Sequence, residues 1–203
     1  MSEQKFGGQL WQFYSDAYRW VVDRYKDEVD WAESLDFAEC TPERFLDEYL
    51  WTVITSGLKI EGAGRKLFEK FKAEGKGAIK HPAKRRAVEA GLLQYRHWFE
   101  RVREMKDEKQ ILEYLDGLPH VGPVTKYQLA QNIGVPVAKP DIWLVRVAAK
   151  FGEKDVQAMC RKIAEWTGHK VRTVDYVIWR YCERGNFQHT SVECPKEKKE
   201  KLI

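Results

Sequence analysis

Apolar residues recur every three or four positions along much of this chain. This spacing places them on one face of an amphipathic helix. No segment shows the sustained alternation of apolar and polar residues, bounded by hairpin turn residues, that is typical of a β-strand. We therefore predict an all-α fold. The first predicted helix carries its apolar face on Trp11, Tyr14, Tyr18, Val21, Val22 and Tyr25.

Capping residues, glycines and prolines indicate where the other helices begin and end. Thr41 followed by Pro42 is typical of a helix start, because threonine caps the first turn and proline fits the first helical position. That helix is expected to end near Gly57. A long amphipathic helix is predicted over residues 83–106, after a loop over residues 75–82. The other predicted helices cover residues 64–73, 108–115, 123–133, 140–151, 155–167 and 173–183.

Length and composition favour one compact unit. The chain has 203 residues, of which 43% are hydrophobic and 33% are charged, and this is enough to bury a substantial core. We predict a single helical domain over residues 1–190, built as one body or as two lobes that share a core. The segment 191–203 is a run of mixed charges with few apolar residues, so we predict that it is disordered. We expect the protein to be a monomer.

Basic residues concentrate in the middle of the chain. The formal net charge is only +4, so the distribution of charge matters more than the total. The concentration predicts a positively charged face that suits DNA. The alternative is an ordinary solvated helix surface whose charges are balanced by Glu89, Glu100 and Glu104. The basic cluster consists of Lys80, His81, Lys84, Arg85, Arg86, Arg96, His97, Arg101 and Arg103.

The cysteines and the apolar runs bear on the cellular location. Cys40, Cys160, Cys182 and Cys194 are far apart, and none forms a Cys-x-x-Cys pair. The first residues lack the apolar stretch of a secretion signal, and no apolar run approaches the length of a membrane span. We therefore expect a cytoplasmic, reduced protein that does not enter the membrane.

The most informative segment is the run Leu-Asp-Gly-Leu-Pro-His-Val-Gly-Pro-Val-Thr-Lys over residues 115–126. A helix that ends in Leu-Pro, a tight turn and a second helix that opens at Pro123 would aim free backbone N–H groups outward. A phosphate satisfies such groups, which makes a nucleic-acid backbone the natural partner. The expected phosphate contacts are the backbone at Val121, Gly122, Val124 and Thr125, the Thr125 hydroxyl and Lys126.

A second element, Lys-Pro-Asp-Ile-Trp-Leu-Val-Arg over residues 139–146, follows this hairpin. Together with Leu-Pro-His-Val-Gly over residues 118–122, it resembles the signature of the helix-hairpin-helix DNA glycosylase superfamily. That signature is a Leu-Pro-Gly-apolar-Gly hairpin followed by an Asp just ahead of a hydrophobic helix that bears Arg. The resemblance covers residues 45–183 and is strongest over residues 112–152. It implies a two-lobed helical fold, an active-site cleft between the lobes and double-stranded DNA as the partner.

The resemblance implies that Asp141 is the catalytic residue. In such enzymes the target nucleotide is rotated out of the duplex, because its glycosidic bond cannot be reached within the stack. A desolvated carboxylate would then stabilise the oxocarbenium-like transition state and orient the attacking water. The alternative is that Asp141 only caps the helix that follows Pro140.

Two departures from the family pattern affect the expected chemistry. Members that also cut the backbone carry a Lys two positions after the second hairpin Gly, where this chain has Val124. The resemblance therefore implies a monofunctional enzyme that leaves an abasic site and lacks AP-lyase activity, although Lys126 or Lys139 remains open as an amine nucleophile. The second departure is His120, which replaces the first hairpin Gly and tolerates a positive φ better than most residues.

The resemblance also suggests residues for contacts to DNA and to the everted base. Gly57 and Leu58 match the turn from which family members insert a wedge side chain into the gap left by the base, and the alternative for Leu58 is a core contact at a helix end. His120 and Arg146 are further candidates for DNA contact. The candidates for stacking on the base are Trp11, Tyr14, Trp51 and Trp143.

No bound cofactor is expected. The iron-sulfur members of the superfamily end in four closely grouped cysteines, whereas the last segment of this chain offers only Cys182, His189 and Cys194. We therefore predict neither an iron-sulfur cluster nor a zinc site, and we interpret these cysteines as unliganded thiols. A monovalent cation held by the hairpin carbonyls, as in relatives, remains open.

These features favour a DNA glycosylase that removes a damaged or modified base in base excision repair. The abundance of aromatic residues favours alkylated purines, whose positive charge makes them good leaving groups. One alternative is removal of a bulky non-damage modification from viral DNA. Another is a non-catalytic DNA-binding module, in which the hairpin grips phosphates and Asp141 only caps a helix.

Overall fold

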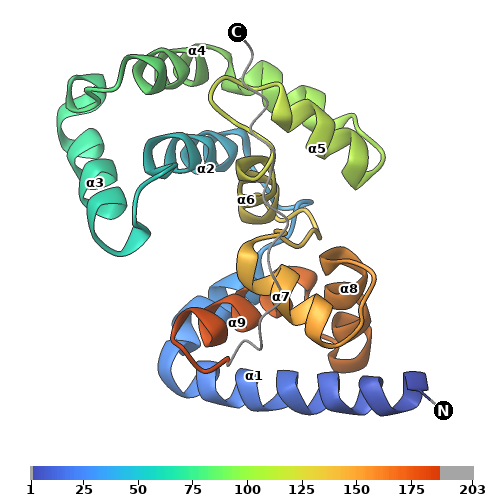
Figure 1. Cartoon of the computed structure of the whole chain (residues 1–203). Helices are drawn as coiled ribbons and strands as arrows, with labels where there is room; N and C mark the ends of the chain where they lie inside the picture. Colours follow the sequence, from blue (N-terminus) through green and yellow to red (C-terminus); the bar gives the residue numbers. More distant parts are fainter. Residues whose placement is uncertain (1, 188–203) are drawn as a thin grey trace, which may run out of the picture.

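The computed structural model describes residues 2–187, and every regular element in that range is helical (Figure 1). This confirms the predicted all-α class. The segment 191–203, for which disorder was predicted, lies outside the described residues. The helices are α1 (Ser2–Ser34), α2 (Pro42–Thr55), α3 (Arg65–Glu74), α4 (Pro82–Arg103), α5 (Glu108–Asp116), α6 (Thr125–Asn132), α7 (Ile142–Lys150), α8 (Val156–Thr167) and α9 (Val171–Glu183), with a π-helical turn at Ile60–Gly64 and a 3-10 turn at Gly75–Ala78.

Local capping chemistry sets the helix starts. Thr41 has an extended backbone, and its hydroxyl accepts a hydrogen bond from an N–H of the first turn of α2 at 3.2 Å. Pro42 is the first residue of that helix, as predicted. The predictions for α6 and α7 began two residues too early, since these helices start at Thr125 and Ile142. For α7 the reason is that Asp141 has an extended backbone and serves as the cap.

The described helices form two groups, each with its own hydrophobic core (Figure 1). The first group consists of α1, α7, α8 and α9, and α1 packs along α9. The second group consists of α2, α4, α5 and α6, with α3 packed against it. The chain therefore leaves the first group after α1 and returns to it after α6. Side chains at the centre of the cores include Val21, Leu144, Met159 and Ile178 in the first and Phe45, Val88, Leu115 and Leu129 in the second.

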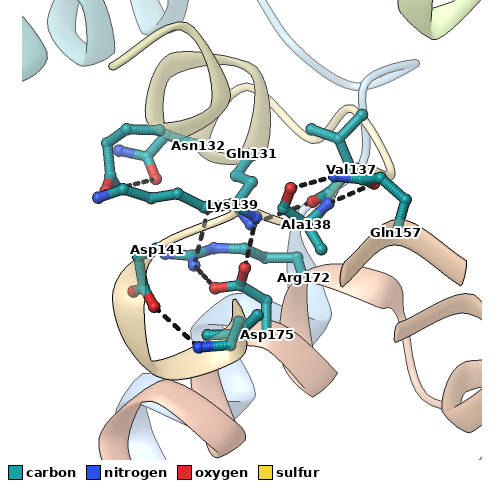
Figure 2. A network of polar contacts seen from close by, with 11 residues as sticks. Gln131, Asn132, Val137, Ala138, Lys139, Asp141, Gln157, Arg172 and Asp175 are labelled. Carbon is teal, nitrogen blue, oxygen red and sulfur yellow. Dashed lines mark hydrogen bonds and ion pairs between the residues drawn. The ribbon is translucent and has the colours of Figure 1, made fainter. Parts of the chain in front are cut away.

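Residues 133–141 connect α6 to α7 and return the chain to the first group. Gln131 Nε2 donates to the Val137 carbonyl at 3.0 Å (Figure 2). Gln157 of α8 accepts from the Ala138 N–H at 2.9 Å and donates to the Ala138 carbonyl. An extended connection has no helical partners for its backbone groups, and these side chains supply them.

Gly134 brings this connection against the linker between α1 and α2. Its φ is +93°, and an added Cβ would lie 2.4 Å from the Asp36 carbonyl carbon and the Phe37 nitrogen. Only glycine combines this φ with such a close approach of two backbones. The two segments that join the helix groups are therefore packed against each other.

Tyr49 attaches the hairpin region to the second core. Its side chain is fully buried, and its hydroxyl lies 3.1 Å from the Ala87 carbonyl oxygen and 2.8 Å from the Pro119 carbonyl oxygen. Gly91 of α4 makes room for the ring, because a Cβ there would lie 2.5 Å from Tyr49 Cε1. The close contact of α2 with α4 thus also fixes the position of the hairpin.

Candidate functional site

A cavity of about 490 Å³ lies where the two helix groups meet, and Asp141 borders it. Residues of α1, α2, α3, α6 and α9 and Lys139 of the α6–α7 connection form the rest of its wall. Its volume lies within the range of sites for small organic ligands. The aromatic side chains that border it are Trp31, Trp51, Phe68, Phe71, Tyr176 and Trp179.

Asp141 uses one carboxylate oxygen to cap α7. Oδ1 accepts from the N–H groups of Trp143 at 2.8 Å and Leu144 at 3.0 Å. Oδ2 accepts no hydrogen bond from the described residues and keeps some accessible surface, and Asp141 itself borders the cavity (Figure 2). Burial raises the pKa of Asp141, and the two N–H donors and Lys139 only partly oppose this rise. The cap contacts and an open oxygen are therefore both present in one side chain.

A buried ion pair borders the same cavity as Asp141. Asp175 accepts from the Lys139 N–H at 2.6 Å and pairs with Arg172 at 3.3 Å (Figure 2). Burial raises the pKa of the Asp175 carboxyl group to about 6, despite the opposing charge of Arg172. Neither residue was predicted from the sequence as part of the site. The available signal was a carboxylate placed among the apolar residues Val174, Val177 and Ile178 of α9.

Polar side chains also form a chain of hydrogen bonds along the cavity wall. Lys139 Nζ donates to Gln128 Oε1 at 3.1 Å, and Gln128 Nε2 donates to Asn132 Oδ1 at 3.1 Å. Asn132 Nδ2 then donates to Glu48 Oε2 at 2.7 Å. All four residues border the cavity. The sequence analysis missed Glu48, Gln128 and Asn132, because α2 and α6 meet only in the fold.

In the hairpin turn, His120 stands where the family pattern has a glycine, and its backbone adopts a conformation that favours glycine. His120 has a φ of +63° and is the non-glycine residue with a positive φ within the range 2–187. The ring lies 5.9 Å from that of His81, the residue before α4. Burial lowers the pKa of His120, and the nearby Lys84 and His81 add to this effect.

Part of the expected phosphate grip is occupied within the hairpin itself. Val121 N donates to the Leu118 carbonyl at 3.0 Å, and Gly122 N donates to Thr125 Oγ1 at 2.8 Å. These two amides and the Thr125 hydroxyl therefore do not point freely outward, in contrast to the expectation. The N–H groups of Val124 and Thr125 have no protein acceptor in the described range, as expected at the start of a helix.

The two cations expected at the DNA already have close neighbours in the protein. Lys126 Nζ pairs with Asp116 at 2.9 Å, and the Lys126 side chain is only 18% exposed. The Arg146 guanidinium lies 5.3 Å from the Trp143 ring centroid, while its Nε is buried without a partner in the described range. Lys126 is thus largely neutralised, whereas Arg146 retains donors for another acceptor.

The expected wedge lies on an exposed turn. Gly57 has a φ of +71°, and the Leu58 side chain is 37% exposed. Lys84 supports this turn, because its buried Nζ donates to the carbonyls of Ile54 at 2.8 Å and Ser56 at 2.6 Å. Lys84 was expected on a positively charged face, but its ammonium group instead stabilises this turn inside the protein.

The aromatic residues expected to stack on a base fall into three places. Trp51 borders the cavity that contains Asp141. Trp143 instead packs against the first core. Trp11 and Tyr14 lie in a separate groove, where the Tyr14 hydroxyl lies 2.8 Å from His169 Nδ1. The reason is that the apolar face of α1 turns toward α8 and α9, whereas Trp31, near its end, reaches the cavity.

Much of the predicted basic face is tied up in ion pairs and hydrogen bonds. Arg96 pairs with Glu43 at 2.6 Å, and Arg101 pairs with Glu104 at 2.7 Å. Arg103 donates to a carbonyl of the α1–α2 linker at 2.9 Å. The alternative of a balanced helix surface thus describes this part of α4 better than a continuous positive patch does.

The described cysteines Cys40, Cys160 and Cys182 are buried and unpaired. Among the side chains that the structure describes, no group of three or more His, Cys, Asp or Glu residues is arranged to hold a metal ion. His189 and Cys194 lie outside the described residues.

None of the described helices combines the length and apolar character needed to cross a membrane. No family model, no curated protein and no solved structure matches this chain.

Proposed function

We propose that the protein is a DNA glycosylase that rotates a damaged or modified base out of duplex DNA and hydrolyses its N-glycosidic bond. The observation that carries this proposal is the Asp141 carboxylate, which is fixed through one oxygen by two N–H donors and borders a cavity of about 490 Å³. A pure helix cap needs no such cavity. The aromatic wall suits a flat, everted base.

The main catalytic requirement of the proposed reaction is one negative charge held close to the sugar. As the base leaves, positive charge develops on the sugar, and a carboxylate in a cavity with little water stabilises that charge strongly. Asp141 Oδ2 would face the sugar and orient the attacking water. Val124 occupies the hairpin position at which a lyase carries its lysine, so the proposed product is an abasic site with an intact backbone.

In this proposal the two helix groups are the two lobes of a helix-hairpin-helix glycosylase, and the cavity is the cleft between them. The free N–H groups of Val124 and Thr125, together with His120 and Arg146, would hold the DNA backbone. Leu58 would fill the gap in the duplex.

The test is base release from duplexes that carry alkylated, oxidised, deaminated or hypermodified bases, followed by alkali to cleave abasic sites. Asp141→Asn should lower the single-turnover rate about 100-fold or more, since it removes the charge. Its thermal stability should stay close to that of the wild type, because Asn is also a good helix cap. Asp155→Asn is the matched control, because Asp155 caps α8 through the Ala158 N–H at 2.8 Å.

Equal release by the wild type and Asp141→Asn would refute the catalytic role. Strand cleavage without alkali, trapped by borohydride, would refute monofunctional action. The cap contacts of Asp141 also support a rival, a non-catalytic DNA-binding module. That module would bind duplexes in a salt-dependent manner and release no base from any of them.

A further inference from the structure

Glu48 stands out among the carboxylates of the cavity because the chain of hydrogen bonds from Lys139 ends on it. The direction of that chain is fixed at both ends. The Lys139 ammonium can only donate, and the Glu48 carboxylate accepts from Asn132 at 2.7 Å. The amides of Gln128 and Asn132 therefore each have one consistent orientation, and their dipoles align along the chain.

The second oxygen of Glu48 is left for a ligand. Glu48 Oε1 accepts no hydrogen bond from the side chains and backbone groups that the structure describes, and it keeps some accessible surface on a residue that borders the cavity. Burial raises the pKa of Glu48, and the Asn132 contact and the charges of Arg44 and Arg172 only partly oppose that effect. A partly desolvated acceptor of this kind gains from any donor that a ligand brings.

We propose that Glu48 reads the everted base and selects bases that present an N–H donor to its open oxygen. This inference rests on the proposed function. The substrate class is a base with a ring N–H or an amino group on the edge turned toward α2. A positively charged, alkylated base of this class fits best, because Trp51 borders the same cavity and aromatic faces attract cations, whereas the Trp31 ring already has the Arg172 guanidinium 5.5 Å from its centroid.

The same geometry explains how Glu48 is kept in place. The Asn132 contact holds Oε2, so the carboxylate cannot turn both oxygens toward the ligand or toward water. Asp47, the neighbouring residue on α2, also borders the cavity but is exposed and takes no part in the chain of hydrogen bonds. The two carboxylates therefore give a natural comparison between a held acceptor and a free charge.

The test uses duplexes in matched pairs that differ by one donor: uracil with N3-methyluracil, hypoxanthine with N1-methylhypoxanthine, and N7-methylguanine with N1,N7-dimethylguanine. For at least one pair, the wild type should release the base that has the N–H about tenfold or more faster than its partner, as expected for a hydrogen bond to a charged group. Single-turnover rates measure the ratio.

Glu48→Gln should reverse or abolish that preference. Its amide oxygen would still accept from Asn132, which places an amide donor where Oε1 stood. Asp47→Asn removes a negative charge from the same wall and should keep the wild-type ratio. Gln128→Leu cuts the chain while leaving Glu48 in place, and should reduce the ratio without reversing it. Thermal unfolding of each variant confirms that it is folded.

The outcomes separate the two proposals. Base release that depends on Asp141, with no preference for donors or with an unchanged preference in Glu48→Gln, would overturn the role of Glu48 and leave the glycosylase proposal standing. The same loss of preference in Asp47→Asn and Glu48→Gln would show a general charge effect and would also overturn it. No release from any duplex by the wild type would refute the proposed function, and the inference would fail with it.

Discussion

Two opposing influences act on the Asp141 carboxylate. Oδ1 faces two backbone donors, which favour the ionised form, while burial of the whole group favours the neutral form. The net effect raises the pKa of Asp141, so burial outweighs the donors. A side chain that only capped a helix at the surface would show the opposite shift, because it would keep its solvation.

This shift predicts the acid limb of the pH profile. The proposed reaction needs ionised Asp141, and a carboxyl group ionises only above its pKa. Because burial raises that pKa, the single-turnover rate should fall on acidification at a pH above the ordinary aspartate value of about 3.9. Release without enzyme is subtracted at each pH.

The Asp141 and Glu48 variants identify the group whose ionisation produces the acid limb of the pH profile. Asp141→Asn should lose it, whereas Glu48→Gln should retain it at lower overall rates, although burial also raises the pKa of Glu48. A limb that persists in Asp141→Asn, or that vanishes in Glu48→Gln, would assign the titration to another group.

At the scale of elements, the contact of α2 with α4 determines where the hairpin lies. The Tyr49 ring fills the space that Gly91 leaves, and its hydroxyl reaches the Pro119 carbonyl at 2.8 Å. A glycine in the middle of a 22-residue helix costs about 1 kcal/mol relative to alanine. Close packing against a fully buried ring is the structural reason for its presence there.

Gly91→Ala should therefore lower the free energy of unfolding despite the better helix propensity of alanine. The new methyl group would lie 2.5 Å from Tyr49 Cε1, and overpacking of this kind costs about 1–3 kcal/mol. Gly8→Ala in α1 is the control, because no atom lies within 4 Å of its Cβ position, and it should be neutral or slightly stabilising. Denaturant unfolding measures both. A stabilised Gly91→Ala would contradict the packing argument.

At the scale of the whole molecule, the two cores are held together by their connections. The linker after α1 and the segment after α6 run in opposite directions between the groups and touch at Gly134. The walls of the cavity come from both groups, so the relative placement of the groups shapes it.

Gly134→Ala should destabilise the protein far more than Gly152→Ala does. Both glycines have a positive φ, +93° and +70°, so both substitutions introduce backbone strain of about 1–2 kcal/mol. Only Gly134 also places the new Cβ 2.4 Å from another backbone segment, whereas nothing lies within 4 Å at Gly152. Equal losses of unfolding free energy in the two variants would show that the contact between the connections adds nothing.

The helical segments and most of their ends could be predicted from the sequence, because helix starts and ends depend on local chemistry. The Thr41–Pro42 start and the Asp141 cap need only neighbouring residues. The hairpin, too, was visible as a motif, and the structure gives His120 a positive φ, which histidine tolerates better than most residues. The prediction was wrong about how Val121 and Gly122 use their N–H groups, because internal acceptors compete with a phosphate.

The sequence by itself determined the all-α class and pointed to Asp141, since periodicity and capping act over a few residues. Only the tertiary structure decided which side chains share the cavity with Asp141. Glu48, Asn132 and Asp175 come from helices far apart in the chain, and Trp11 and Tyr14 turned to another groove. The physical reason is that a local pattern assigns a residue to the buried face of its helix, whereas the packing of the two cores determines which buried faces meet.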